Sequence, residues 1–345
     1  MNAGLITIAV DAMSGDHGAA VAVPAALDVL TTTPDLRLLI VGRGEVVHPL
    51  VAGADPARCT VVEASEVVGM DERPKDAVRR KKDSSMRVAV NLVRKGEAAA
   101  CVSAGNTGAL LATARFVLGM VPGIDRPAIV SAVPAAHGQT VMLDLGANPD
   151  CSAEHLVQFA VMGSVIASDL HGVDRPRIGL LNIGEEEIKG TDELREAHRR
   201  LVASPLNYRG FVEGNVIFSG DVDVVVTDGF SGNIALKTME GLARFIGSVM
   251  REEFTAGPLR KLGALAASPA LRGLKRRLDP GAYNGASMVG LAGVVIKSHG
   301  GADRAAFASA VRVAIVEARK GVPRQIGELM SSVAAPRPAG DASAT

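Results

Sequence analysis

Short apolar runs rich in Val, Ile and Leu alternate along the chain with longer amphipathic stretches. Near-continuous apolar runs of this kind are typical of strands buried on both faces of a parallel sheet. We expect strands at 5–10, 37–42, 59–64, 98–105, 128–134, 140–146, 177–184, 215–220 and 222–228. We expect helices at 19–31, 74–96, 107–119, 153–170, 191–203 and 232–254. This alternation predicts an α/β fold in which helices cover both faces of a largely parallel sheet.

Polar, glycine-rich segments follow five of the expected strands. These segments are 11–18, 103–108, 144–150, 182–191 and 227–233. In an open α/β sheet, ligands bind beyond the carboxyl ends of the strands, where the free N–H groups of helix N-termini favour anions. Glycines let the backbone approach such an anion closely. Any one segment is also typical of an ordinary strand-to-helix turn, but the five together favour a binding pocket.

Two of these segments share the pattern V-[ST]-x-G-x-[ST]-G, at 102–108 and 226–232. They are either two similar anion-binding loops that flank one ligand or a chance similarity.

The composition and the absent motifs argue against several functional classes. Lys and Arg number 37 against 37 Asp and Glu, and aromatic residues make up 3% with no Trp, which argues against nucleic-acid binding. The chain has no complete G-x-G-x-x-G fingerprint, no Walker A motif and no G-x-S-x-G nucleophile elbow. Asp11, Asp16 and His17 could hold a divalent cation, but a hydrogen-bonded turn suits them better. We therefore expect no cofactor and no metal.

Cysteine usage and hydropathy indicate the compartment. Cys59, Cys101 and Cys151 form no C-x-x-C pair, which is typical of a reduced, cytoplasmic protein. The start of the sequence lacks a basic n-region, and no apolar run reaches about 18 residues. We expect neither a signal peptide nor a spanning helix.

Two stretches are strongly basic. Residues 73–87 carry seven Lys and Arg against two Asp, a pattern typical of a solvated helix face or of a docking patch for an acidic partner. Residues 255–278 contain no acidic residue, and their leucines recur mostly at helical spacing. Pro258 suits a helix start, and Pro269 divides two short helices. Such a basic amphipathic hairpin is typical of a membrane-surface element, a dimer contact or core packing.

These features suggest the domain organisation. We expect residues 1–330 to form one catalytic α/β domain, with 255–280 protruding as a basic amphipathic helical hairpin. Residues 331–345 are mostly small and include proline, so we expect a disordered tail.

Seven motifs, in order along residues 5–320, are similar to those of one family. They are AVDAMSGDHG, RRKKDSSM, VSAGNTGALLA, LDLGAN, LLNIGEEEIKG, TDGFSGNIALKTMEG and YNGASMVGLAGVVIKSHG. Together they resemble the bacterial phosphate acyltransferase family of phospholipid synthesis, the acyl-ACP:phosphate acyltransferases known as PlsX, where ACP is acyl carrier protein. The first motif departs from the family at Ser14, where the family usually has Gly.

The resemblance implies a three-layer α/β/α sandwich similar to phosphotransacetylase and isocitrate-dehydrogenase-like folds. It implies a cytoplasmic homodimer that associates peripherally with the membrane. The implied reaction is the reversible transfer of a long-chain acyl group from acyl-ACP to inorganic phosphate. The acyl phosphate would then supply a membrane glycerol-phosphate acyltransferase.

Under this resemblance phosphate itself attacks the thioester, so no Ser-His-Asp triad is needed. We expect Lys189, Asn233, Asn106 and His17 to be catalytic. Lys189 would neutralise charge on phosphate or on the oxyanion, oriented by at least one carboxylate of residues 185–187, and His17 would be a proton donor unless it is a structural turn residue. The residues expected to bind substrate or phosphate are Asp11, Gly105, Thr107, Gly108, Asn148, Asn182, Ser231, Gly232, Lys297 and His299.

The two basic stretches would bind the partners. The residues expected to dock ACP are Arg79, Arg80, Lys81 and Lys82. The residues expected to contact the membrane are Leu262, Leu265, Leu271 and Leu274. Two other functions stay open: a phosphotransacetylase that acts on a short acyl-CoA, and a non-enzymatic scaffold that binds acyl-ACP at the membrane surface.

Overall fold

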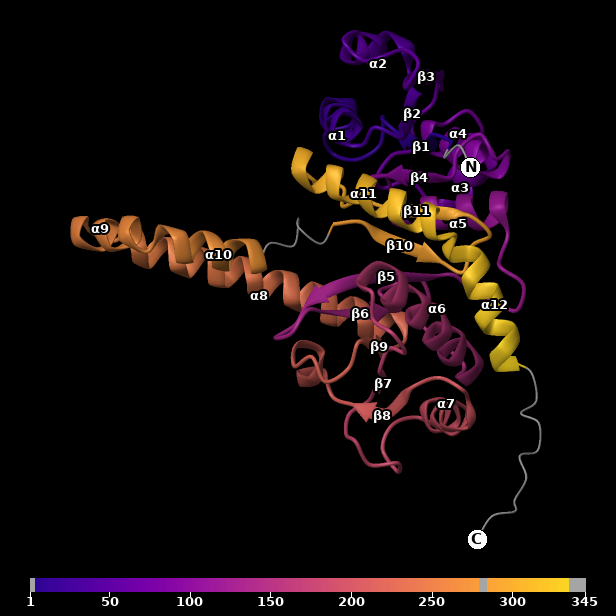
Figure 1. Cartoon of the computed structure of the whole chain (residues 1–345), viewed down its shortest axis with the longest axis vertical. Helices are drawn as coiled ribbons and strands as arrows, with labels where there is room; N and C mark the ends of the chain where they lie inside the picture. Colours follow the sequence, from indigo (N-terminus) through magenta and orange to yellow (C-terminus); the bar gives the residue numbers. More distant parts are fainter. Residues whose placement is uncertain (1–3, 279–283, 335–345) are drawn as a thin grey trace.

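One sheet of 11 strands runs through residues 4–278 and 284–334, which the computed structural model describes (Figure 1). The strand order is β3-β2-β1-β4-β11-β10-β5-β6-β9-β7-β8. The first parallel set comprises β1 (Ile6–Asp11), β2 (Leu36–Gly42), β3 (Cys59–Glu63), β4 (Ala100–Ser103) and β11 (Val294–Lys297). The second comprises β6 (Gln139–Leu143), β7 (Ile178–Leu181), β8 (Tyr208–Val212) and β9 (Val224–Val226). Between them lie β10 (Ala286–Val289) and β5 (Ala128–Pro134).

The two parallel sets run in opposite directions. The pairs β11–β10, β10–β5 and β5–β6 are all antiparallel, and an odd number of reversals inverts the strand direction. The carboxyl ends of β1, β4 and β11 therefore gather at one place, and those of β6, β9 and β7 gather at another. The polar strand ends therefore lie in two groups, whereas their number favoured one binding pocket.

Alternating side chains of the first set bury both faces. Ile8 and Val10 pack in one core cluster, while Ala9 between them packs in another. The helices of the first cluster are α1 (Ala19–Thr32), α2 (Gly44–Val51) and α11 (Arg304–Lys320). Those of the second are α3 (Pro74–Arg80), α4 (Ser85–Arg94) and α5 (Thr107–Leu118). The near-continuous apolar runs reflect this two-sided burial.

The second set is covered in the same way. Val141 and Leu143 face one cluster, and Met142 faces the other. The helices on the first side are α6 (Ala153–His171), α7 (Asp192–Ala203) and α12 (Val322–Ala334). On the other side lie the 3-10 helix η1 (Gly214–Phe218) and the start of α8 (Gly229–Thr255). The predicted three-layer α/β/α arrangement is confirmed.

Three predicted elements were wrong in detail. The single helix expected at 74–96 is divided into α3 and α4, because Ser84 caps a new helix by accepting a hydrogen bond from the Arg87 N–H (3.3 Å). The strand expected at 215–220 is η1, and the strand β8 just before it was missed. Helix α12 continues to Ala334, four residues into the tail expected from 331, and residues 335–345 lie outside the described residues.

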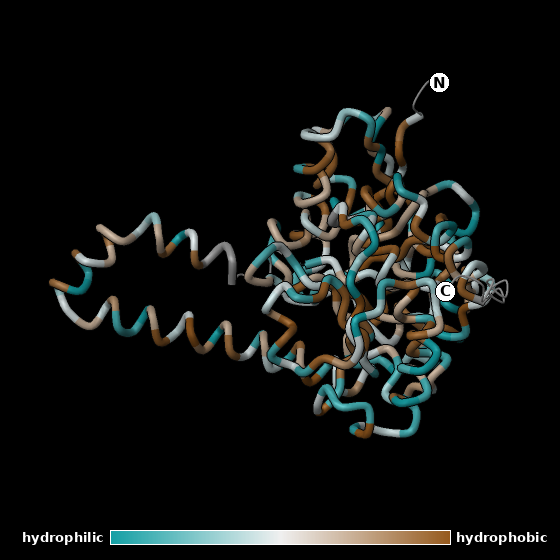
Figure 2. Tube along the Cα trace, turned by 60° about the horizontal axis from the view of Figure 1, so that its bottom comes forward, coloured by the Kyte–Doolittle hydropathy of each residue, from teal (hydrophilic) through white to brown (hydrophobic). Residues whose placement is uncertain are grey.

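A helical hairpin projects from the body where α8 continues beyond the sheet (Figures 1 and 2). It comprises the end of α8, α9 (Pro258–Ala266) and α10 (Ser268–Leu278), so the helix break falls where Pro269 predicts it. Leu262 is 64% exposed and Leu265 is 72% exposed, whereas Leu271 is half-buried. The expected extension of the hairpin to 279–280 lies outside the described residues.

Candidate active site

The first polar cluster, formed where β1, β4 and β11 end, is held by buried side chains. The Ser103 hydroxyl donates a hydrogen bond to the Asp11 carboxylate (2.6 Å), which also accepts from the Met13 N–H (3.3 Å). The Lys297 ammonium donates to the carbonyls of Ala104 (3.2 Å) and Ser298. Asp11 therefore serves a hydrogen-bonded turn. Among the described residues, no group of three or more His, Cys, Asp or Glu is arranged to hold a metal ion.

Lys297 is the electrostatic centre of this first cluster. Burial lowers the pKa of its ammonium to about 8, while the negative charges of Asp11 and Asp16 oppose that shift. The positive charge of Lys237, on the third turn of α8, lowers this pKa further. An amine that titrates near neutral pH can hold or release a proton during a reaction.

Asn106 has a structural role that the sequence did not reveal. Its side-chain oxygen accepts a hydrogen bond from the Ala109 N–H (2.9 Å) and so caps α5. Its amide nitrogen donates to the carbonyls of Met70 (2.6 Å) and Glu72 (3.3 Å). Because both ends of the amide are engaged, the N–H groups at the start of α5, on Thr107 and Gly108, are better placed to meet an anion.

The remaining expected residues of the first cluster differ in accessibility. His17 and His299 are both exposed, and the His299 Nδ1 accepts a hydrogen bond from the Gly301 N–H (3.1 Å). Gly105 is buried, and it allows close packing against Met86, because a Cβ at this position would lie 2.5 Å from the Met86 Cε. His17 is thus the less constrained of the two histidines.

The second polar cluster, formed where β6, β9 and β7 end, is built around buried Asp144. Its carboxylate accepts hydrogen bonds from the N–H groups of Ile129 (3.0 Å) and Asn148 (2.7 Å) and from the Asn148 amide (2.9 Å). Burial nevertheless raises its pKa, against the effect of these bonds. Asn148 also donates to the Pro127 carbonyl (2.8 Å), so its amide is engaged in the fold rather than available to a substrate.

Helix α8 begins in close contact with Asp144. A Cβ on Gly232 would lie 2.0 Å from the Asp144 carbonyl oxygen, which explains the glycine by close approach. Asp228 caps the helix by accepting hydrogen bonds from the N–H and the hydroxyl of Ser231, both at 2.8 Å. Asn233 is exposed, and its side chain lies over Gly146, 3.5 Å from the position of a Cβ there. Of these expected residues, Asn233 is the one directed outward.

Two hydrogen-bond donors lie close together after β7, and one of them, the Asn182 amide, has no acceptor in the described structure. Asn182 is 8% exposed; its side-chain oxygen accepts from the Ile183 N–H (2.9 Å), but its amide nitrogen has no hydrogen-bond partner. Gly190, next to Lys189, contacts Asn182, since a Cβ there would lie 2.4 Å from the Asn182 oxygen. Lys189 is 44% exposed and lies 4.0 Å from Glu186, which is the carboxylate that orients it.

Two residues of α8, one turn apart, relate to different clusters. The Asn233 side chain lies over Gly146 in the second cluster, and the positive charge of Lys237 lowers the pKa of Lys297 in the first. Neither Lys237 nor Asp144 was predicted to have a role. Lys237 could have been found from its spacing, because residues four apart lie on the same face of a helix and Asn233 was already a candidate. Asp144 could have been found because it is a single acidic residue at the end of an apolar strand.

The two loops with the shared pattern form similar turns, but they are capped differently. Asn106, the fifth residue of the pattern, caps α5, whereas Asp228, the third residue, caps α8. The shared residues therefore reflect two strand-to-helix turns on oppositely directed strands.

The basic stretch at 73–87 is only partly available to a partner. Lys81 is engaged with Glu72 at 2.9 Å and also donates to a backbone carbonyl. Arg79, Arg80 and Lys82 are exposed. Within residues 4–278 and 284–334, no helix combines the length and apolar character that crossing a membrane requires.

Comparison with known proteins defines the family. The family described as "Fatty acid synthesis protein" matches residues 6–325. The chain is 56% identical over 333 residues to a phosphate acyltransferase of Alkalilimnicola ehrlichii, covering 96% of this chain and 97% of that protein. It is 54% identical over 336 residues to a phosphate acyltransferase of Methylococcus capsulatus, covering 96% and 99%. The chain belongs to this fatty acid synthesis family, and it is an enzyme of the acyltransferase class.

Solved structures share the fold. A phosphotransacetylase from Streptococcus pyogenes superposes with a TM-score of 0.64 at 18% identity, covering 92% of this chain and 94% of that chain. The EutD phosphotransacetylase from Staphylococcus aureus gives a TM-score of 0.58 at 15% identity, with the same coverage. The expected similarity to the phosphotransacetylase fold is confirmed.

Proposed function

We propose that this chain transfers a long-chain fatty acyl group from acyl-ACP to inorganic phosphate, reversibly, to give acyl phosphate and free ACP. One observation supports a site for this chemistry above all others. The buried amide nitrogen of Asn182 has no hydrogen-bond partner, and the Lys189 loop lies beside it. Donors left without an acceptor are complementary to an oxyanion.

The proposed step is direct displacement. A phosphate oxygen bonds to the thioester carbon, the carbonyl oxygen becomes an oxyanion, and the carbon–sulfur bond breaks as the carbonyl re-forms. The thiolate leaves readily because a thiol has an ordinary pKa of about 8.5. Lys189 and Asn182 stabilise the oxyanion, and Asn233 positions the phosphate. Lys297 and His17 are the proton donors available to the departing thiolate.

Product analysis tests this proposal. Palmitoyl-ACP is incubated with the protein with and without inorganic phosphate, and free ACP thiol and acyl phosphate are measured together. The proposal predicts phosphate-dependent thiol release with equal acyl phosphate. Release from acetyl-CoA but not from palmitoyl-ACP would indicate a phosphotransacetylase, and release from neither would indicate a binding scaffold.

ACP is proposed to dock on Arg79, Arg80 and Lys82, because these exposed cations are complementary to an acidic carrier. Reversing Arg80 to Glu is expected to raise KM for acyl-ACP several-fold and to weaken its dependence on salt. Lys95→Glu, a charge reversal of an exposed lysine at the end of α4, is the matched control. Equal KM values for the two variants would remove this docking site.

The hairpin is proposed to contact the membrane through Leu262, Leu265 and Leu274, close to the membrane glycerol-phosphate acyltransferase that would consume the product. Leu274 is 40% exposed and, like Leu262 and Leu265, presents an apolar surface to the outside of the hairpin. Liposome sedimentation tests this: Leu262→Glu with Leu274→Glu is expected to reduce binding while soluble turnover continues. Unchanged sedimentation would count against it.

A homodimer is proposed through α8, whose exposed stripe includes Leu242 at 54% and Phe245 at 64% exposure. Such a stripe on a long helix is typical of an interface between copies. Analytical ultracentrifugation tests it: Phe245→Glu is expected to shift a dimer toward monomer, and a wild-type monomer at all concentrations would refute it.

A further inference from the structure

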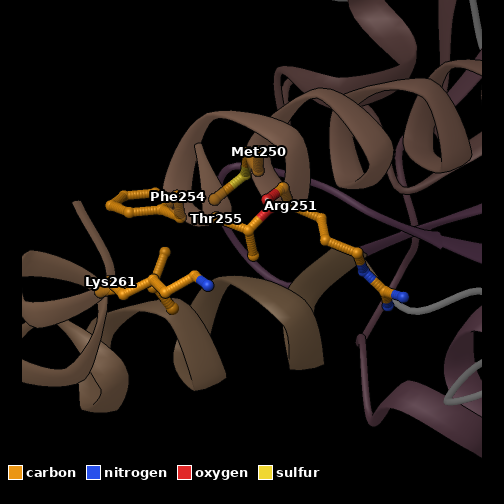
Figure 3. A pocket seen from close by; sticks show the side chains of 7 residues that line it. Met250, Arg251, Phe254, Thr255 and Lys261 are labelled. Atoms are coloured by element: carbon orange, nitrogen blue, oxygen red, sulfur yellow. Dashed lines mark hydrogen bonds between the residues drawn. The ribbon is translucent and has the colours of Figure 1, made fainter. Parts of the chain in front are cut away.

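An open pocket of about 350 Å³, called the cavity below, lies between the end of α8 and the helices α9 and α10 (Figure 3). Its lining residues are Met250, Arg251, Phe254, Thr255, Lys261, Ala264 and Leu271. The volume lies within the range of about 300–1,000 Å³ typical of small-molecule sites. None of these residues belongs to either polar cluster, so the cavity is separate from the candidate active site.

The hairpin carries apolar side chains inward as well as outward. Met250, Phe254 and Leu271 are half-buried around the cavity, whereas Leu259 is 83% exposed on the outside. Leu271 was expected to contact the membrane, but the structure turns it toward the cavity. The inward apolar side chains hold the hairpin helices together and leave the cavity with a mainly apolar lining.

The charges beside the cavity indicate the ligand class. Arg251 and Lys261 form no ion pair with any carboxylate of the described residues, whereas neighbouring Arg260 pairs with Glu253. Cations without partners, next to an apolar cavity, are complementary to an amphiphile with an anionic head. Figure 3 shows Lys261 across the gap from Phe254 and Thr255 of α8.

We propose that this cavity binds the alkyl chain of an acyl phosphate, with Lys261 near its phosphate head. No bond forms or breaks here; the site holds the product of the reaction before it reaches the bilayer. The identity of the ligand rests on the proposed function, but binding can be measured without turnover.

The test uses hexadecyl phosphate, a stable analogue, below its micelle concentration and without vesicles. Ala264→Phe fills the cavity, whereas Ala270→Phe adds the same side chain at an exposed position on α10 outside the lining. Isothermal titration calorimetry is expected to show at least tenfold weaker binding for Ala264→Phe and wild-type binding for Ala270→Phe. Equal affinities of the two variants, or no binding by the wild type, would overturn the proposal.

Chain length and headgroup separate a cavity from simple partition. Affinity for octyl to hexadecyl phosphates is expected to rise about fourfold per methylene until the cavity is full, and then to level off. Lys261→Gln is expected to weaken binding of hexadecyl phosphate but not of hexadecanol. An affinity that keeps rising with chain length up to hexadecyl phosphate would contradict binding in the cavity. An equal effect of Lys261→Gln on hexadecyl phosphate and hexadecanol would contradict it as well. If palmitoyl-ACP is not a substrate, the proposed function fails, but these binding results still decide the cavity.

Discussion

The two polar clusters use similar residues in opposite ways. In the first, Asp11, Ser103 and Lys297 are hydrogen-bonded inside the fold, although the buried Ser14 hydroxyl has no hydrogen-bond partner. In the second, Asp144 satisfies the backbone, but Asn182 keeps an unpaired amide nitrogen beside the partly exposed Lys189. A closed network stabilises geometry, whereas donors without acceptors await a ligand. Because the unpaired Asn182 amide lies beside a partly exposed lysine, we propose that the oxyanion forms at the second cluster.

Asparagine illustrates the difference most directly. Asn106 and Asn182 both follow a buried strand, yet the amide of Asn106 makes three hydrogen bonds and caps α5. Asn182 uses its oxygen alone. Residue type and position therefore do not define a substrate-binding amide; the partners that the fold supplies do.

The largest expected effect comes from Lys189. Changing it to Met removes a positive charge from the oxyanion, which we expect to lower kcat by about 10²–10³-fold at saturating phosphate. The matched control is Lys237→Met, which removes a lysine that acts on the first cluster and is expected to lose much less. Near-normal turnover of Lys189→Met would mean that the oxyanion does not form at the second cluster.

A pH-dependent effect should follow from Lys297. Its folded pKa of about 8 lies below the ordinary value of 10.5, so the unfolded chain binds more protons between these pH values and stability rises with pH across that window. The burial penalty is complete below pH 8 and amounts to roughly 3 kcal/mol.

Urea unfolding of wild type and Lys297→Met between pH 7.5 and 10 measures this. The wild type is expected to gain stability relative to the variant as pH rises, because the variant lacks the titrating group. A difference that stays constant with pH would show that Lys297 is not held in a penalised, buried state.

A packing effect of intermediate size is expected at the start of α8. Gly232→Ala places a Cβ against the Asp144 carbonyl and should destabilise the fold by about 1–3 kcal/mol. Gly241→Ala, farther along the same helix and facing open space, should stabilise it by about 0.5–1 kcal/mol. Thermal unfolding of both variants is expected to show a lower Tm for Gly232→Ala and a higher Tm for Gly241→Ala. Two Tm shifts in the same direction would contradict the close contact at Gly232.

The smallest expected effect comes from the unpaired amide. Asn182→Leu keeps a similar volume but removes the neutral donor, and we expect kcat to fall about tenfold with KM for acyl-ACP little changed. Steady-state kinetics separates the two constants. A change in KM alone would place Asn182 in ground-state binding rather than at the oxyanion.

Local patterns predicted eight of the 11 strands in the described residues, because two-sided burial gives those strands a clear apolar run. They predicted most helices, but they missed β8, β10, β11, α2, α11 and α12. The reversal between the two strand sets was not predictable, because it depends on the pairing of β10 with β5, whose residues lie far apart in sequence. The role of Asn106 was also hidden, since its partner Met70 lies 36 residues away. The cap itself could have been predicted, because Asn directly before a helix commonly accepts a hydrogen bond from the N–H three residues later, here that of Ala109.

The most direct test of the central claim uses phosphate labelled with oxygen-18 in all four positions. If phosphate attacks the thioester carbon, mass spectrometry of the acyl phosphate formed from palmitoyl-ACP will show all four labels retained, and no thiol will be released without phosphate. Thiol released without phosphate, in an amount close to that of the enzyme, would mean that an acyl-enzyme forms first, and direct displacement by phosphate would be wrong.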